Sequence, residues 1–181
     1  VVKMIVEGEI ENVNKLEPTD EELLNRAVTQ EMNDKRAEEG WDEEVKKRAE
    51  AEPEEYKDLY TRYQASEVAT EKANKDADQS KQNFEAFYGD ADFSRTFDMD
   101  KDKDKDEIKN ILNAKSIEPT DQNIAKFIQG HEGVKTGASV ATDADKEKEE
   151  ARHALEAEVG KDIEVEVRKD FENPAKMGSL R

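Results

Sequence analysis

Residues 98–107 read DMDKDKDKDE, and in this stretch an aspartate stands at every second position. The five are Asp98, Asp100, Asp102, Asp104 and Asp106, with lysines between most of them. In an extended backbone this alternation places carboxylates on one side and ammonium groups on the other. The stretch decides the fold because it is either a set of metal ligands or a solvated connector between two helical parts.

A calcium loop of the helix–loop–helix type needs oxygen ligands at positions 1, 3 and 5, a glycine at position 6 and a bidentate Glu at position 12. Counting from Asp98 places Asp98, Asp100 and Asp102 correctly but puts lysines at positions 6 and 12. Counting from Asp90 fails at the same two positions. Ca²⁺ binding by these aspartates is therefore disfavoured, and the pattern favours an acidic connector over residues 90–107.

On the N-terminal side of the connector the pattern is helical. Thr19 followed by Glu22 fits a capping box, in which each side chain satisfies a backbone amide of the first helical turn. A long helix is predicted over about 54–88, because Pro53 suits a helix start and Gly89 a helix end. Residues 1–13 are rich in β-branched and aliphatic side chains, which favours a short strand or an extended arm.

On the C-terminal side, Glu-Pro-Thr-Asp at 118–121 repeats the sequence of residues 17–20 and again precedes an amphipathic helical pattern. Two glycines and many small side chains predict a loop over residues 131–145. The segment 162–169 alternates apolar and charged residues, which predicts a half-buried strand that pairs with the N-terminal one.

These elements predict a mainly α fold of elongated, loosely packed helices with short terminal β-strands, rather than a compact globule. The expected organisation has three parts. Residues 1–89 form the N-terminal arm and helices, 90–107 the acidic connector, and 108–181 the C-terminal helices with one strand and a tail.

Composition limits what this chain can bury. Charged residues make up 42% of 181, the formal net charge is −18, and Leu, Ile, Val and Phe together number 33. So few large apolar side chains with so much charge are typical of chains that do not bury enough surface to offset chain entropy. We therefore expect order to depend on contacts with another molecule.

The same composition bears on partners and location. The negative charge disfavours nucleic acid and anionic membranes as direct partners. No apolar run reaches the length of a membrane span, and the opening VVKMIVEGEI is too short and too charged for a signal peptide. We expect a soluble protein, with its compartment left open because cysteine is absent.

No motif in the sequence predicts catalysis or a cofactor. His131 and His153 are the two histidines, and neither stands in a zinc-binding spacing. His131 is expected in a loop, and His153 on the surface of a charged helix. The glycines lack the spacing of a phosphate-binding loop, and the many carboxylates have little apolar material around them to shift their pKa values. We predict a protein without enzymatic activity, cofactor or metal.

The favoured hypothesis is a structural or assembly protein that packs on partner subunits. Large particles, virions among them, contain chains of this composition. Aromatic and large apolar side chains supply most contact energy per residue, so they are the predicted partner-binding anchors. They are Trp41, Tyr56, Leu59, Tyr60, Tyr63, Phe84, Phe87, Tyr88, Phe93, Phe97 and Phe127. An ordinary small core within the chain is the alternative use of the same residues.

Two other hypotheses remain open. An acidic inhibitor or chaperone of a basic, nucleic-acid-binding protein would display its carboxylates in rows, as a DNA mimic does, and would bind in a salt-sensitive way. The lysines interspersed among the carboxylates count against it. A disordered stress or linker protein also fits the composition.

Overall fold

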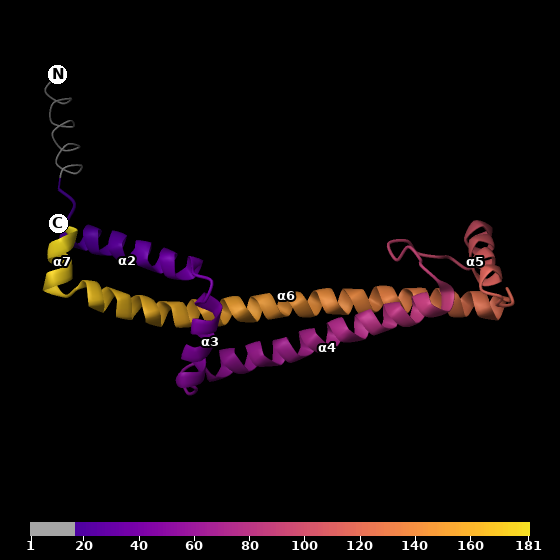
Figure 1. Ribbon diagram of the computed structural model, residues 1–181, viewed down its shortest axis with the longest axis horizontal. Helices are drawn as coiled ribbons and strands as arrows, with labels where there is room; N and C mark the ends of the chain where they lie inside the picture. The colour runs from indigo at the N-terminus through magenta and orange to yellow at the C-terminus, as the bar shows by residue number, and fades with distance from the viewer. Residues whose placement is uncertain (1–16) are drawn as a thin grey trace, which may run out of the picture. The chain divides into compact units, whose positions relative to one another are not determined.

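Residues 17–181 of the computed structural model are described, and within this range every regular element is an α-helix (Figure 1). The mainly α prediction is therefore confirmed. The helices are α2 (Asp20–Ala37), α3 (Trp41–Ala51), α4 (Lys57–Tyr88), α5 (Asp102–Ala114), α6 (Asp121–Phe171) and α7 (Pro174–Leu180). The arm or strand predicted over residues 1–13 lies outside the described residues.

The chain divides into two units. Unit 1 is Val1–Tyr60 together with Ala154–Arg181, and unit 2 is Thr61–His153. Unit 1 holds α2, α3, α7 and the last part of α6, whereas unit 2 holds most of α4, all of α5 and the first part of α6. Each unit has its own buried apolar residues.

Unit 1 is built on α2, whose start shows the threonine half of the predicted capping box: the Thr19 hydroxyl accepts a hydrogen bond from the Glu22 amide at 3.1 Å. The helix then buries Val28 and Met32. Figure 1 shows α7 folding back toward the start of α2, where the Arg181 Nε donates to Asp20 Oδ1 at 3.1 Å. The core of this unit is completed by residues of α3 and α6, namely Trp41, Val45, Ala49, Leu155, Val159 and Ile163.

Unit 2 is an antiparallel pair of helices. Gly130 of α6 lies against Phe84 of α4, and Gly137 lies against Ala77. Positions that rise along α6 thus face positions that fall along α4, as the opposite courses of the two ribbons in Figure 1 also show. Further along the pair, the Thr70 hydroxyl donates to the carbonyl oxygen of Ala144 at 3.0 Å.

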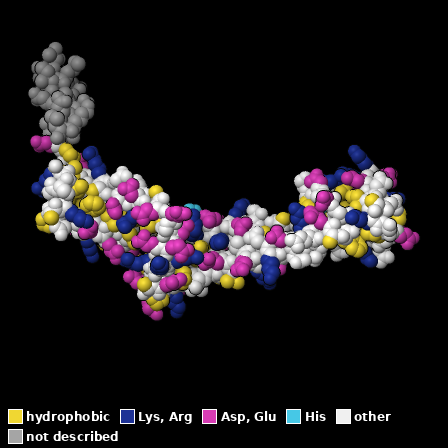
Figure 2. Space-filling model, in the orientation of Figure 1, with side chains coloured by type: hydrophobic (Ala, Val, Ile, Leu, Met, Phe, Trp, Pro, Cys, Tyr) yellow, Lys and Arg dark blue, Asp and Glu magenta, His cyan; other side chains and the backbone are white. Residues whose placement is uncertain are grey.

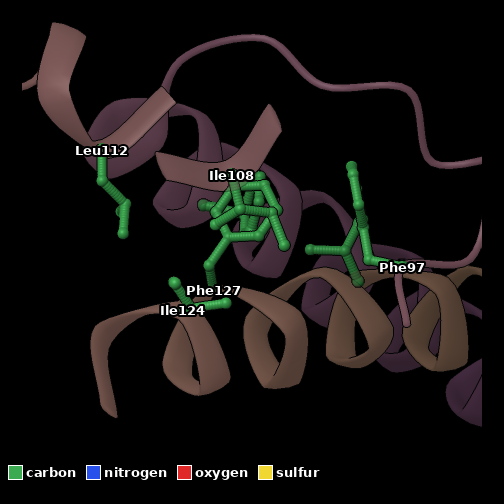
Figure 3. Packing of buried hydrophobic residues seen from close by; sticks show 7 residues of the cluster. Phe97, Ile108, Leu112, Ile124 and Phe127 are labelled. Atoms are coloured by element: carbon green, nitrogen blue, oxygen red, sulfur yellow. The ribbon is translucent and has the colours of Figure 1, made fainter. Parts of the chain in front are cut away.

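The apolar core of unit 2 lies where α5 packs on the start of α6. Figure 3 shows Ile108 and Leu112 of α5 pointing toward Ile124 and Phe127 of α6, with Phe97 beside them. Ile108, Leu112, Ile124 and Phe127 are each completely buried. The spacing of three and four residues on both helices explains this packing, since it places each pair on one helical face.

The strand predicted over residues 162–169 is wrong, because these residues belong to α6. Ala151, Leu155, Val159 and Ile163 recur every fourth residue, and all four are buried. This helical stripe extends into the predicted strand, whereas Val165, the next apolar residue of the alternation, is 51% exposed. The apparent alternation arises because charged residues on the outer face of a helix separate a few valines.

The loop predicted over residues 131–145 also differs from the structure, since α6 runs through it without a break. A glycine in a helix interior costs about 1 kcal/mol relative to alanine. Gly137 lies against α4, where a Cβ added to it would stand 3.7 Å from the Ala77 Cα, an ordinary van der Waals distance. The apolar stripe of Ile124, Phe127 and Val134 likewise continues across Gly130 and Gly133.

The acidic stretch does not stay extended to its end. α5 begins at Asp102, so the last residues of the stretch form helical turns with Asp102 and Asp104 in the first turn. Carboxylates are favourable there because the amide dipoles leave positive charge at a helix N-terminus. Residues 89–101, which precede α5, are called the strap below.

Candidate protein-binding surface

The predicted anchors lie mainly inside the chain. Six are buried: Trp41, Tyr56, Tyr63, Phe84, Phe97 and Phe127. Leu59, Tyr60, Tyr88 and Phe93 are half-buried. Phe87 stands apart with 58% of its surface exposed. The alternative use of these residues, a small core within the chain, therefore accounts for the six buried anchors, and Phe87 remains open to a partner.

In unit 1 the anchors serve local packing. The buried Tyr56 donates its hydroxyl hydrogen to the Asp162 carboxylate of α6. Burial, with this hydrogen bond, raises the pKa of the Tyr56 phenol well above its usual range. The Tyr60 hydroxyl donates to Glu50 Oε1 at 2.7 Å. Both rings therefore tie the start of α4 to neighbouring elements of unit 1.

In unit 2 the rings form what we call the aromatic cluster: Phe84, Tyr88, Phe93, Phe97, Phe127 and His131. Phe84 lies at its centre, with ring centroids 4.9 Å from Tyr88 and 5.3 Å from both Phe93 and Phe127. Burial among these rings raises the pKa of the Tyr88 phenol. The edge and tilted geometries are those in which aromatic pairs attract each other.

His131 differs from its predicted place in a loop. It is completely buried on α6, and its ring stacks on Phe93 with the centroids 5.1 Å apart. The Nε2 hydrogen is donated to the carbonyl oxygen of Asp92 at 2.8 Å. The signal in the sequence was the spacing of three and four residues from Ile124 through Phe127 to His131, which continues across Gly130.

Charged side chains hold the strap in place. Arg95 donates to Asp104 at 2.8 Å and to Glu107 at 2.6 Å, while Asp104 also accepts the Asp98 amide at 2.9 Å. From α6, Lys135 donates to the carbonyl oxygen of Arg95 at 3.1 Å. These contacts, together with Phe93 and Phe97, fix the strap over the aromatic cluster.

The aspartates of the 98–107 stretch thus serve turns and ion pairs. Asp98 Oδ1 accepts the Asp100 amide at 2.9 Å, and Asp104 is engaged by Arg95. Across residues 17–181, no three side chains of His, Asp or Glu come together in a way that would hold a metal ion. In the same range no helix is both long and apolar enough to cross a membrane.

The contact between α4 and α6 has two different parts. Thr70, Ala77 and Phe84 of α4 contact α6, and they recur with a seven-residue period, as in a coiled coil. Tyr63 extends this set, and Ser66, Ala73, Ser80 and Phe87 form a second set with the same period three residues further on. The middle of this contact is therefore small or hydroxylated, and its end is aromatic. Phe87 is in register with the contact but remains largely exposed.

A groove of about 510 Å³ lies beside this aromatic end, and we call it the α4–α6 groove. Its lining is Asp76, Gln79, Ser80, Asn83, Phe84, Phe87 and Tyr88 of α4 with Lys126 and Gly130 of α6. The rings form an apolar end, and the amide and hydroxyl side chains form a polar floor. Sequence reasoning missed the polar lining, although its spacing of three and four residues places it on one face of α4.

The two charges of the groove stand at its opposite ends. Gly130 lies against Phe84 and Tyr88 in the antiparallel pair, so Lys126, one turn earlier in α6, belongs to the Tyr88 end. Asp76 is twelve residues before Tyr88, which corresponds to roughly 18 Å along a helix. Neither Asp76 nor Lys126 forms an ion pair with another described residue. Both charges are therefore open to a partner.

A comparison of this chain with known protein families, with curated proteins and with solved structures finds no match.

Proposed function

We propose that this chain is a non-enzymatic assembly protein that binds a partner protein subunit through the α4–α6 groove of unit 2. The observation that carries the proposal is Phe87, a large aromatic side chain that is in register with a helix–helix contact and yet 58% exposed. Aromatic residues at the edge of a groove are typical anchors of protein interfaces. A partner that buried Phe87 would remove the exposed part of its apolar surface from water.

The non-enzymatic part of the proposal is supported by the layout of the groove. Its carboxylate and its ammonium group stand at opposite ends, which Asp76 and Tyr88 mark roughly 18 Å apart along α4 by helical rise. General acid–base chemistry needs such groups within hydrogen-bond reach of one reacting atom. The hydroxyl and amide side chains between them are suited to hydrogen bonds with a partner.

The wider form of the proposal is that partner subunits complete the ordering of elongated, loosely packed helices in a large particle, such as a virion. It is supported by the composition and by the small side chains that form the contact between α4 and α6, which we call the seam. Ser66, Thr70 and Ala141 are buried there, and none of them supplies much apolar area. A helix pair with a seam of this kind gains stability when a further apolar surface covers its aromatic end.

The test compares two exposed apolar residues of α4. Phe87→Ser removes the proposed anchor, whereas Val68→Ser changes a residue that is 69% exposed and does not line the groove. Each tagged chain is used to capture proteins from its native source, and the captured proteins are quantified. We expect a stoichiometric partner that the wild-type chain and Val68→Ser retain and that Phe87→Ser loses. Equal capture by all three chains would contradict the proposal.

A second candidate function is the acidic inhibitor or chaperone of a basic protein, and the distribution of charge favours it. In the described part of unit 1, Asp and Glu number 23 against 12 Lys and Arg, whereas unit 2 has 21 against 15. Figure 2 shows many acidic side chains over α2 and α3. Five exposed carboxylates gather around the start of α3: Glu38, Glu39, Asp42, Glu43 and Glu44.

The dependence of partner capture on salt concentration distinguishes the two candidate functions. Charge-driven capture by unit 1 weakens steeply as ionic strength rises, because exposed charges are screened over about 8 Å at physiological salt. Capture through Phe87 depends on apolar burial and persists at high salt. A partner released by salt and indifferent to Phe87→Ser would favour the acidic inhibitor.

A further inference from the structure

We infer that the partner at the α4–α6 groove is a second copy of this chain, bound around a two-fold axis that crosses the groove. The inference rests on the proposed function, because it assigns a specific occupant to the same surface.

The opposite charges at the two ends of the groove are complementary to those of a second copy turned end to end. Asp76 stands at one end and Lys126 at the other, with neither paired within the described residues. A two-fold axis through the middle of the groove exchanges its ends, so Asp76 of each copy meets Lys126 of the other. Interfaces of this kind repeat every contact twice, as two-fold dimers do. Two ion pairs form where each copy alone has two unpaired charges.

The same axis provides a site for Phe87. The exposed ring lies near the Lys126 end of its own groove, so in the dimer it faces the Asp76 end of the other copy. Ser80 and Gln79 follow Asp76 by three and four residues on α4 and line that end of the groove. Each Phe87 would then lose its exposure against a polar floor whose amides and hydroxyls pair across the interface.

Charge distribution favours this unit over the rest of the chain. Two copies of a chain with a net charge of −18 repel each other. The excess of acidic residues is 6 in unit 2 and 11 in the described part of unit 1, so self-association through unit 2 meets the smaller repulsion. The groove itself carries one positive and one negative side chain and adds no net charge.

The experiment is sedimentation equilibrium of the full chain from ~1 µM to ~100 µM, a range that covers dimers of ordinary affinity. The variants are Phe87→Ser, Asp76→Lys, Lys126→Asp, the double variant Asp76→Lys with Lys126→Asp, and Val68→Ser as the matched control. Circular dichroism of each variant verifies that its helices are retained. A wild-type chain that dimerises in this range is the first expected result.

The variants then test the two-fold arrangement. Phe87→Ser and each single charge reversal should weaken the dimer about tenfold or more, because they remove an anchor or oppose like charges. The double reversal should restore dimerisation, and Val68→Ser should leave it unchanged. Recovery in the double variant is specific to pairing between Asp76 and Lys126.

Three results would overturn the inference: a monomeric wild type over the whole range, a dimer that Phe87→Ser or the single reversals leave intact, or single reversals that the double variant does not rescue. A monomeric wild type would leave the proposed function standing if Phe87→Ser still lost a different captured partner. If the wild type is monomeric and Phe87→Ser captures the same proteins as the wild type, then the groove is not a binding surface.

Discussion

Asp104 differs from the other aspartates of the 98–107 stretch because it is buried, with 8% of its surface exposed. It accepts hydrogen bonds from Arg95 and from the Asp98 amide, and so joins the strap to α5. Asp106, two residues later, is exposed. The alternation seen in the sequence therefore contains one structural aspartate among solvated ones.

Replacing Asp104 by alanine should lower the free energy of unfolding of unit 2 by about 2 kcal/mol, because it leaves an amide and part of a guanidinium without acceptors. Arg95 keeps Glu107 and is partly exposed, which limits the loss. Asp106→Ala should stay within about 0.5 kcal/mol of wild type. Urea denaturation followed by circular dichroism, with hydrogen exchange of the amides in 89–101, measures both. Equal effects of the two substitutions would contradict this role.

Glu55 and Asp162 make unit 1 sensitive to pH. A hydrogen bond with the Asp162 carboxylate raises the pKa of Glu55 from 4.5 to about 7, and nearby Glu52 acts in the same direction. The pKa of Asp162 is lowered by this bond, by the one from Tyr56 and by the charge of Arg48. The two carboxyl groups thus share a proton that only Glu55 gives up near neutrality.

The direction in which the stability of unit 1 changes with pH follows from the raised pKa of Glu55. The stabilisation from protonated Glu55 is complete below pH 4.5 and is lost as the pH rises through about 7. Glu55→Gln keeps a donor toward Asp162 at every pH, so the stability of unit 1 should change less between about pH 5 and pH 8 than in the wild type. Glu54→Gln is the neighbouring control. Urea titrations that follow the fluorescence of Trp41 test this, and identical slopes for Glu55→Gln and wild type would contradict it.

At the scale of elements, α6 contains the segment in which the sequence pattern predicted a strand and the structure has a helix. A strand would place Ile163 and Val165 on the same face, because side chains alternate with a period of two. In the helix Ile163 is 4% exposed and Val165 is 51% exposed. Ile163→Ser should therefore cost about 2 to 3 kcal/mol of the free energy of unfolding, and Val165→Ser less than about 0.5 kcal/mol. Denaturation followed by Trp41 fluorescence measures both, and similar costs would support the strand instead.

The elements that the sequence predicted well are those with strong local signals. Thr19 caps α2 with its hydroxyl, and the Thr120 hydroxyl accepts the Asn123 amide in the same way at 3.1 Å. Gly89 ends α4 in a left-handed conformation, as a glycine after a helix often does. Local hydrogen bonds and backbone preferences decide these positions, and they can be read from a few adjacent residues.

The features that the sequence did not predict depend on contacts between residues that are distant along the chain. Gly137 suits a loop by its local preference, but in the structure it lies inside α6 and against Ala77 of α4, 60 residues earlier in the chain. The spacing from Ile124 and Phe127 places His131 on the apolar face of α6, but three of the four rings around it come from α4 and from the strap. The groove likewise combines residues about 50 positions apart, namely Asp76 and Lys126. Such pairings cannot be derived from spacing along one helix.

At the scale of the whole molecule, the low content of large apolar side chains is distributed over two units, each with its own small core. Most predicted anchors are used in these cores, and Phe87 remains as the exposed one. The proposed role in assembly therefore depends on one groove rather than on a general lack of order. Partners should therefore add stability to unit 2 rather than create its fold.

The most direct test of this account is photo-crosslinking in the native source, with a photoreactive amino acid placed at position 87 or, as the control, at position 68. Both positions are exposed on α4, and Phe87 alone of the two lines the groove. We predict a discrete crosslinked protein product from position 87 and none from position 68. No product from position 87, or the same products from both positions, would contradict a role in assembly through the α4–α6 groove.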